Sequence, residues 1–478
     1  MQPFQSIKKY QEELALDDNG CLDTVQYYLH RIHANKHLNA FVEVFSEECL
    51  KRASELDRKR VSGADIGLLH GVIISIKDVI CYENHKVSAA SAILKGFTSI
   101  YSATAVQRLL DEDAIIIGSC NCDEFAMGNT NENSVYGPVL NGLDQTKVPG
   151  GSSGGSAVAV QAGLCMLSLG SDTGGSVRQP ADFCGIIGLK PTYGTISRYG
   201  LIAYASSFDQ IGIFGTCIED VSILLKIISG SDNFDSTASL QKFNIPPPKI
   251  NKCGYRIAFL KSGLDHVALD PEIKSKIETL GSGLKEGKHL VKYIDFQLFD
   301  YVLPTYYVLT TAEASSNLAR YDGVRYGNRS ELNNNELTKF YTANRSAGFG
   351  DEVKRRIMLG TFVLSSGYYE SYYSKAQQIR RLLVKESEQI FKEFDAIILP
   401  TVPSTAFALG KLNKDPVESY LADIYTVYAN LIGIPAISIP LFKHSNGMPF
   451  GVQIMTNKYN ELTLLEMADS VLSNYKEY

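Results

Sequence analysis

The sequence has few features of a membrane or secreted protein. No stretch of about 18 uninterrupted apolar residues occurs, and residues 1–9 lead into no apolar signal region. The nine cysteines are scattered and odd in number, which favours reduced thiols over a disulfide framework. We therefore expect a cytoplasmic protein that does not bind membranes.

An excess of basic residues is also missing. Lysine and arginine number 46 against 52 aspartate and glutamate, which gives a formal net charge of −6. This balance provides no electrostatic footprint for a polyanion. If a nucleic acid takes part in the function, we expect another chain to hold most of it.

Two loops rich in glycine and serine, residues 148–156 and 171–180, are the most informative part of the chain. Residues 157–162 and the apolar segment 164–169, which lie between them, argue against a flexible linker. A phosphate-binding Walker loop needs a lysine after its last glycine, but Ser156 follows Gly155. Clustered hydroxyls and free backbone N–H groups instead favour an acyl-transfer site.

A serine nucleophile needs a base to activate it, and this base is usually histidine. No histidine occurs between His85 and His266, the segment that holds both loops. A distant histidine could still fold into the site. The alternative is Lys77, which follows the apolar, β-branched residues 72–76. These predict a buried strand that delivers Lys77 to its carboxyl end, where open α/β sheets bind ligands. Taken alone, such a lysine is more often an ion-paired edge residue.

These motifs, in this order and spacing, resemble the amidase signature family, whose members use a Ser-cisSer-Lys triad. The resemblance implies that Ser176 is the nucleophile, Ser152 the bridging serine held in a cis peptide, and Lys77 the base. Burial would lower the pKa of Lys77 enough for it to accept a proton. The turn that contains Thr173, Gly174 and Gly175 offers consecutive N–H groups for an oxyanion hole.

Further motifs resemble one branch of the family, the glutaminase (A) subunits of tRNA-dependent amidotransferases. They comprise residues 123–128 with 131–134, 190–194, 206–212, 321–327 and 348–350 through 368–369. The branch implies hydrolysis of glutamine through an acyl-enzyme on Ser176. The ammonia released would convert Glu-tRNA(Gln) to Gln-tRNA(Gln), and in some organisms Asp-tRNA(Asn) to Asn-tRNA(Asn). A free-standing amidase that hydrolyses a small amide is the alternative.

Glutamine carries an α-carboxylate and an α-ammonium, and the resemblance assigns Arg356, Asp423 and Tyr307 to bind it. An arginine fork suits the carboxylate, and a carboxylate suits the ammonium. From the residues alone, Arg355 and Arg356 are nearly interchangeable.

The branch also implies a heterotrimer with two partners, the B and C subunits of the amidotransferase. The B subunit would use ATP and Mg²⁺, receive ammonia and hold most of the misacylated tRNA, and the small C subunit would wrap the interface. We expect no cofactor in this chain and no metal site. His30, His33 and His37 share a helix face, but no carboxylate or cysteine completes a ligand set.

The predicted fold class is α/β, with the amidase signature architecture of a large, mixed, twisted sheet covered by helices on both faces. We expect a single domain over residues 1–478. Within it, the pattern predicts a helical segment over about 1–60, the signature core over about 61–230, a more helical region over about 270–394 and returning strands over 395–478. The helical region should end in a helix with Ile379, Leu382, Leu383, Ile390 and Phe394 on one face.

Overall fold

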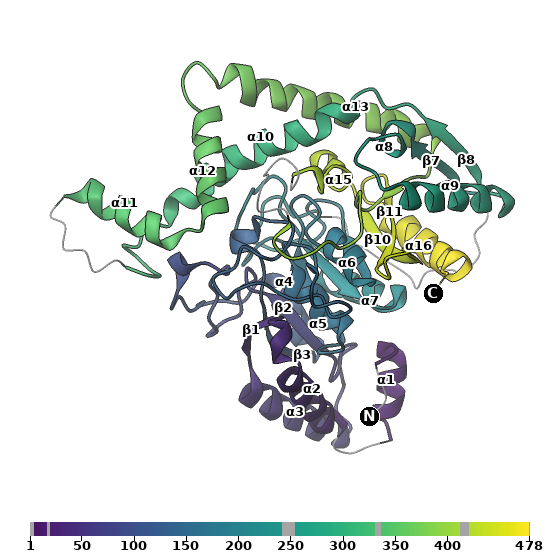
Figure 1. Ribbon diagram of the computed structural model, residues 1–478. Helices are drawn as coiled ribbons and strands as arrows, with labels where there is room; N and C mark the ends of the chain where they lie inside the picture. Colours follow the sequence, from purple (N-terminus) through teal and green to yellow (C-terminus); the bar gives the residue numbers. More distant parts are fainter. Residues whose placement is uncertain (1–3, 17–19, 241–253, 330–335, 412–419, 478) are drawn as a thin grey trace.

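The computed structural model describes residues 4–16, 20–240, 254–329, 336–411 and 420–477 (Figure 1). Within these residues, eleven strands form one sheet in the order β1-β3-β2-β4-β6-β5-β10-β11-β9-β7-β8. The strands are β1 (Phe41–Val44), β2 (Ile73–Lys77), β3 (Ile115–Cys120), β4 (Leu167–Ser171), β5 (Ile187–Lys190), β6 (Ile211–Gly215), β7 (Arg256–Leu260), β8 (Leu290–Ile294), β9 (Ala396–Pro400), β10 (Ala436–Lys443) and β11 (Pro449–Thr456).

The sheet is mixed. β2 runs parallel to both β3 and β4, and β7 runs parallel to β8 and β9. The strands between these two groups pair antiparallel, from β4 through β6, β5, β10 and β11 to β9. This confirms the predicted α/β class with a large mixed sheet, in which β9–β11 lie in the same sheet as the strands of the first half.

Both faces of the central sheet are covered. Every residue of β2, β3, β4, β6 and β9 is buried, with no alternation of buried and exposed positions. Helices α6 (Arg178–Cys184) and α16 (Glu461–Tyr475) both pack on β10 and β11. Both helices therefore cover these two strands. The described residues contain no helix that is long and apolar enough to span a membrane.

The N-terminal segment contains the expected helices and one strand that the sequence did not predict. Helix α1 (Ile7–Leu14), α2 (Gly20–Ala34) and α3 (Ser46–Val61) lie below the sheet in Figure 1. Val25, Tyr28 and Ile32 of α2 recur at helical spacing and are buried. The unpredicted strand is β1, which adds to the sheet edge antiparallel to β3.

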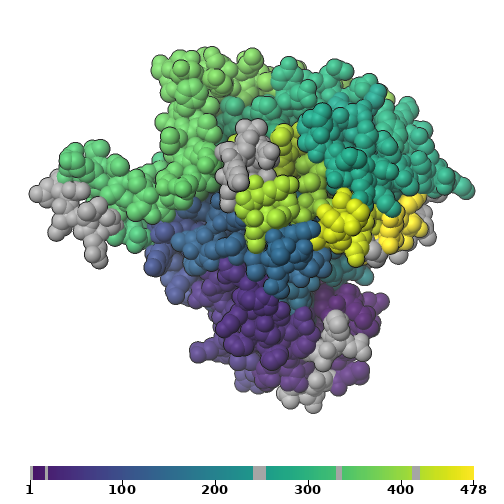
Figure 2. All heavy atoms as spheres, viewed as in Figure 1, coloured from purple at the N-terminus to yellow at the C-terminus, as the bar shows by residue number. Residues whose placement is uncertain are grey.

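The more helical region lies mainly along the top of the molecule in Figure 1. Its helices are α9 (Pro271–Glu286), α10 (Phe299–Asn317), α11 (Leu337–Gly348), α12 (Asp351–Val363) and α13 (Lys375–Glu393), and the short α8 (Lys261–Leu264) precedes them. α11 projects from one side of the molecule (Figures 1 and 2). On α13 the prediction for Leu382 is wrong, because its side chain is 50% exposed while Leu383 is buried.

The strand order places the two glycine- and serine-rich loops at one edge of the sheet. β2 ends at Lys77 and its parallel neighbour β4 ends at Ser171. Helix α5 (Gly154–Gln161) begins inside the first loop, and α6 begins within the second. Because the carboxyl ends of parallel strands meet at one edge, Lys77 lies beside both loops.

Candidate active site

Lys77 is the last residue of β2, and its side chain is completely buried. Its Nζ lies 2.6 Å from Ser152 Oγ, 2.9 Å from Ser153 Oγ and 2.9 Å from Ser171 Oγ. Lys77 and Ser152, which the sequence analysis paired, are thus in direct contact. Ser153 and Ser171 are contacts that the sequence analysis missed, although the parallel pairing of β2 with β4 would have brought Ser171 to the same edge.

The surroundings of Lys77 favour its neutral form. Burial lowers the pKa of Lys77 to about 8, while Cys122 and the carboxylates of Asp123, Asp172 and Asp209 act in the opposite direction. An unperturbed lysine is almost fully protonated at neutral pH. A substantial neutral fraction is therefore present near pH 8.

The hydrogen bonds around Lys77 leave its lone pair for Ser152. The Ser153 hydroxyl donates to the Ser171 carbonyl oxygen at 3.1 Å, so its oxygen is an acceptor toward Lys77. A neutral amine has two hydrogens and one lone pair. When these hydrogens are donated to Ser153 and Ser171, the lone pair can accept the hydroxyl proton of Ser152.

The backbone around Ser152 is tightly enclosed. The peptide bond between Gly151 and Ser152 is cis, the geometry that the family resemblance implied. The Gly151 N–H donates to Gln179 Oε1 at 3.0 Å, and the Ser152 carbonyl oxygen accepts from the Asp123 N–H at 3.0 Å. A Cβ atom at Gly151 would lie 2.2 Å from Asp123 Oδ2, so this position has room only for glycine.

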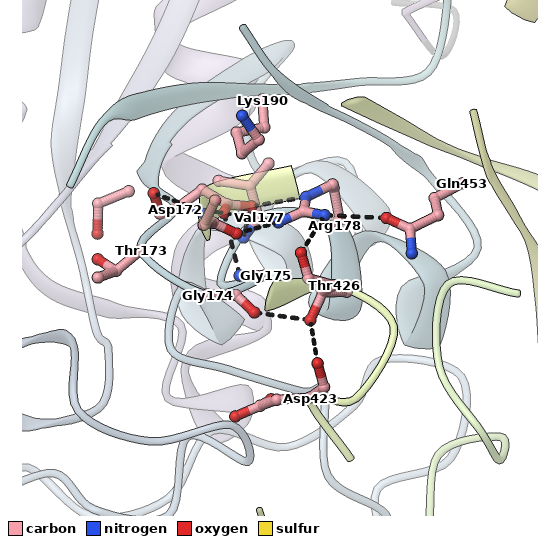
Figure 3. Close-up of polar contacts among 12 residues, drawn as sticks. Asp172, Thr173, Gly174, Gly175, Val177, Arg178, Lys190, Asp423, Thr426 and Gln453 are labelled. Carbon is pink, nitrogen blue, oxygen red and sulfur yellow. Dashed lines mark hydrogen bonds and ion pairs between the residues drawn. The ribbon is translucent and has the colours of Figure 1, made fainter. Parts of the chain in front are cut away.

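Ser176 lies in the turn between β4 and α6, and the Asp172 carboxylate organises that turn. Asp172 accepts the N–H groups of Gly175 at 3.0 Å and Val177 at 3.2 Å (Figure 3). It also pairs with the fully buried Arg178, at 3.0 Å from NH2 and 3.1 Å from Nε. Burial by itself would raise the pKa of Asp172, but Arg178 above all outweighs it and holds the pKa at about 2. The carboxylate is therefore ionised at neutral pH.

The backbone N–H groups of this turn are not all alike. Gly175 donates its N–H to Asp172, whereas the N–H groups of Thr173, Gly174 and Ser176 donate to no acceptor among the described residues. The Ser176 side chain is 7% exposed. The turn thus presents three N–H groups beside a nearly buried hydroxyl.

Close packing explains the two glycines of the turn. A Cβ atom at Gly174 would lie 2.2 Å from the Tyr306 hydroxyl, and one at Gly175, where φ is +125°, would lie 2.2 Å from Thr426 Oγ1. Thr426 Oγ1 donates to the Gly174 carbonyl oxygen at 2.6 Å and lies 3.2 Å from the Asp423 carbonyl oxygen (Figure 3). Thr426 therefore ties the segment that carries Asp423 to the turn that carries Ser176.

Arg356 is the buried arginine of the adjacent pair on α12. It is 4% exposed, and its guanidinium carbon lies 5.5–5.8 Å from the ring centres of Tyr204, Tyr307 and Tyr420. The Arg355 side chain is 45% exposed and contacts Glu352. The structure therefore separates two residues that the sequence left interchangeable, because only Arg356 faces the interior.

Asp423 lies at the other end of the same aromatic cluster. The Tyr307 hydroxyl donates to Asp423 Oδ2 at 2.6 Å, and Asn129 Nδ2 lies 3.4 Å from Oδ1. Burial raises the pKa of Asp423 to about 6, against the hydrogen bond from Tyr307 and the charge of Arg356. Tyr307 thus lies between one positive and one negative group, an arrangement that suits a zwitterion.

No group of three or more histidine, cysteine, aspartate or glutamate side chains that could hold a metal ion occurs in the described parts of the chain. Cysteines are unpaired wherever the structure describes them. Asp172, Arg178 and the contacts of Arg356 with Tyr204 and Glu352 were missed by sequence reasoning. Only Asp172 and Arg178 carried a signal, since both lie in the second loop motif.

Comparison with known proteins shows which family shares this sequence. The family model described as Amidase matches residues 23–465. The A subunit of glutamyl-tRNA(Gln) amidotransferase from Prosthecochloris aestuarii is 46% identical over 475 residues, which cover 98% of each chain. The protein of the same name from Chlorobium phaeobacteroides is 46% identical over 472 residues, covering 97% of this chain and 98% of the relative.

A solved structure of a protein with the same name as these relatives has a similar fold. The crystal structure of the A subunit of glutamyl-tRNA(Gln) amidotransferase from Thermotoga maritima is similar over 98% of this chain and 94% of its own, with a TM-score of 0.80 and 36% identity. The family model and the full-length relatives, together with the two serine loops beside a buried lysine, lead to one conclusion. The chain belongs to the amidase family.

Proposed function

We propose that this protein is the glutamine-hydrolysing A subunit of a glutamyl-tRNA(Gln) amidotransferase. The observation that carries the proposal is the buried Lys77 amine 2.6 Å from Ser152 Oγ. The next residue, Ser153, donates its N–H to the Ser176 carbonyl oxygen at 3.2 Å, which places this pair beside the turn that holds Ser176. The full-length relatives that bear this name support the choice of substrate and reaction over a free-standing amidase.

In the proposed reaction, neutral Lys77 accepts a proton from Ser152, which accepts one from Ser176. The Ser176 oxygen forms a bond to the side-chain amide carbon of glutamine. The carbon–nitrogen bond then breaks, the nitrogen takes up the proton, and ammonia leaves a glutamyl ester on Ser176. Water hydrolyses this ester, which releases glutamate and restores the Ser176 hydroxyl.

The charge that develops on the amide oxygen needs nearby donors. We assign this role to the N–H groups of Thr173, Gly174 and Ser176, which have no other acceptor among the described residues. Gly175, also expected there, already donates its N–H to Asp172. Its proposed part is to let the turn pass close to Thr426.

The two charged groups of glutamine, its α-carboxylate and its α-ammonium, match the two charged side chains beside Tyr307. Arg356 would bind the α-carboxylate through its free guanidinium edge, and Asp423 would bind the α-ammonium. Tyr307 contacts both groups and would orient them. A free-standing amidase for an uncharged amide would have no use for this pair.

The ammonia would serve to convert Glu-tRNA(Gln), and in some organisms Asp-tRNA(Asn), to the amidated form. This chain has a net charge of −6, so we assign most of the contact with tRNA to a partner, the B subunit. That partner would use ATP and Mg²⁺, the C subunit would complete a heterotrimer, and no cofactor would bind here. Such a role in translation would place the protein in the cytoplasm.

The test uses the assembly purified from its native host. The Ser176→Ala assembly should lose glutamine-dependent amidation of Glu-tRNA yet keep amidation driven by an ammonium salt. Loss of both activities in an intact assembly would contradict the separation of ammonia production from its use. A chain that purifies without any partner and hydrolyses other amides would instead support the free-standing amidase.

A further inference from the structure

The guanidinium of Arg356 is only partly satisfied within the protein. Its Nε–H donates to Glu352 Oε1 at 2.8 Å, and one N–H of NH1 donates to the Tyr204 hydroxyl at 2.9 Å. A guanidinium has five N–H groups, so three remain. Among the described residues none of these three finds an acceptor, although the side chain is 4% exposed. Donors that have no acceptor within the protein, on a residue that solvent barely reaches, are available to a bound ligand.

The two existing hydrogen bonds fix the plane of the guanidinium, because they hold it at different edges. Tyr204 is itself rigid: it is 1% exposed, its N–H donates to Asp209 Oδ2 at 2.9 Å, and its carbonyl oxygen accepts from Asn317 Nδ2 at 3.1 Å. Glu352 precedes Arg356 by one helical turn on α12 and also lies 3.4 Å from the Tyr420 hydroxyl.

From this geometry we propose that Tyr204 and Glu352 are positioning residues, which hold Arg356 so that its NH2 edge faces the α-carboxylate of bound glutamine. The inference rests on the proposed function. Neither residue needs to touch the substrate or take part in proton transfer. Their effect is therefore confined to substrates with a carboxylate at this position, and it appears in KM rather than in kcat.

The sharpest variant is Tyr204→Phe, because it removes one hydroxyl and keeps the buried ring beside Arg356. A hydrogen bond to a charged group contributes enough to predict a rise of about tenfold in the KM for glutamine, with kcat changed less than about threefold. The second substrate is 4-aminobutanamide, which keeps the amide and the ammonium but lacks the carboxylate. Its kcat/KM should be the same in Tyr204→Phe and wild type.

Tyr10→Phe is the matched control, since Tyr10 is also buried and its hydroxyl donates to one carbonyl oxygen, that of Gly71, at 3.0 Å. It should leave both substrates unaffected. Glu352→Gln, which keeps an acceptor oxygen, should raise the KM for glutamine less than Glu352→Ala does.

Two results would overturn the inference while leaving the proposed function intact. One is a wild-type KM for glutamine in Tyr204→Phe. The other is an equal loss of kcat/KM for glutamine and 4-aminobutanamide, which would indicate general damage to the site. A wild-type protein that hydrolyses 4-aminobutanamide but not glutamine would overturn the proposed function itself.

Discussion

The rate of glutamine hydrolysis should depend on pH through Lys77. The proposed base is the neutral amine, and burial lowers the pKa of Lys77 to about 8. The neutral fraction is then about one hundredth at pH 6, about a tenth at pH 7 and about nine-tenths at pH 9. We expect kcat to rise by about tenfold from pH 7 to a plateau above pH 9.

The assay is glutamate release at saturating glutamine, so that titration of the free substrate does not enter kcat. Asp423, whose pKa is about 6, would affect the profile only at its acidic end. A directional control is Asp123→Asn. The Asp123 carboxylate raises the pKa of Lys77, so its removal should move the rise in kcat to lower pH.

A kcat that is flat between pH 6 and 9 would refute Lys77 as the base, and so would one that falls with rising pH. A shift of the Asp123→Asn profile to higher pH would refute the electrostatic reasoning. In either case the fold of each variant is checked by circular dichroism over the same pH range.

Other changes test the substrate site and the turn. Arg356→Ala removes a buried partner of the carboxylate worth about 3 kcal/mol, so the KM for glutamine should rise more than about a hundredfold. Ammonium-driven amidation by Arg356→Ala should be unchanged. The KM for glutamine of the exposed control Arg355→Ala should also be unchanged. A wild-type KM for glutamine in both variants would favour the free-standing amidase. Asp172→Asn leaves the buried Arg178 without its counter-charge, so urea unfolding should show a loss of about 3 kcal/mol or more. An unchanged midpoint would contradict this.

The catalytic candidates could be read from the sequence because they lie in short, contiguous motifs. The β-branched run before Lys77 predicts a strand, and the two loops each follow an apolar segment, so the sheet topology brings their ends together. Ser152 and Lys77 are in contact as a result. The same reasoning, carried to the end of β4, would have included Ser171.

The substrate site could not be built in the same way, because its parts come from distant segments. Thr426 reaches the Gly174 carbonyl across 252 positions of sequence, and Tyr204 reaches Arg356 across 152. No local pattern encodes such contacts. The choice between Arg355 and Arg356 likewise depends on which side of α12 packs against α10.

The incorrect prediction that Leu382 faces the core comes from the width and composition of the buried side of α13. Neighbouring helix positions point about 100° apart, and the buried side of α13 is narrow, so Leu383 is buried while Leu382 is exposed. The buried stripe of α13 continues from Leu383 to the polar Ser387, whose hydroxyl donates back to the Leu383 carbonyl oxygen and lies 2.6 Å from the Tyr428 hydroxyl. A polar residue in a buried stripe hides the true periodicity from a count of apolar residues.

The proposed function depends above all on nucleophilic attack by the Ser176 hydroxyl on the side-chain amide of glutamine. The most direct measurement is the rate of glutamate release from glutamine by Ser176→Ala, purified with its partners and shown to be folded. We expect a loss of at least about a thousandfold relative to wild type, because the acyl-enzyme cannot form. A rate within about tenfold of wild type would contradict it.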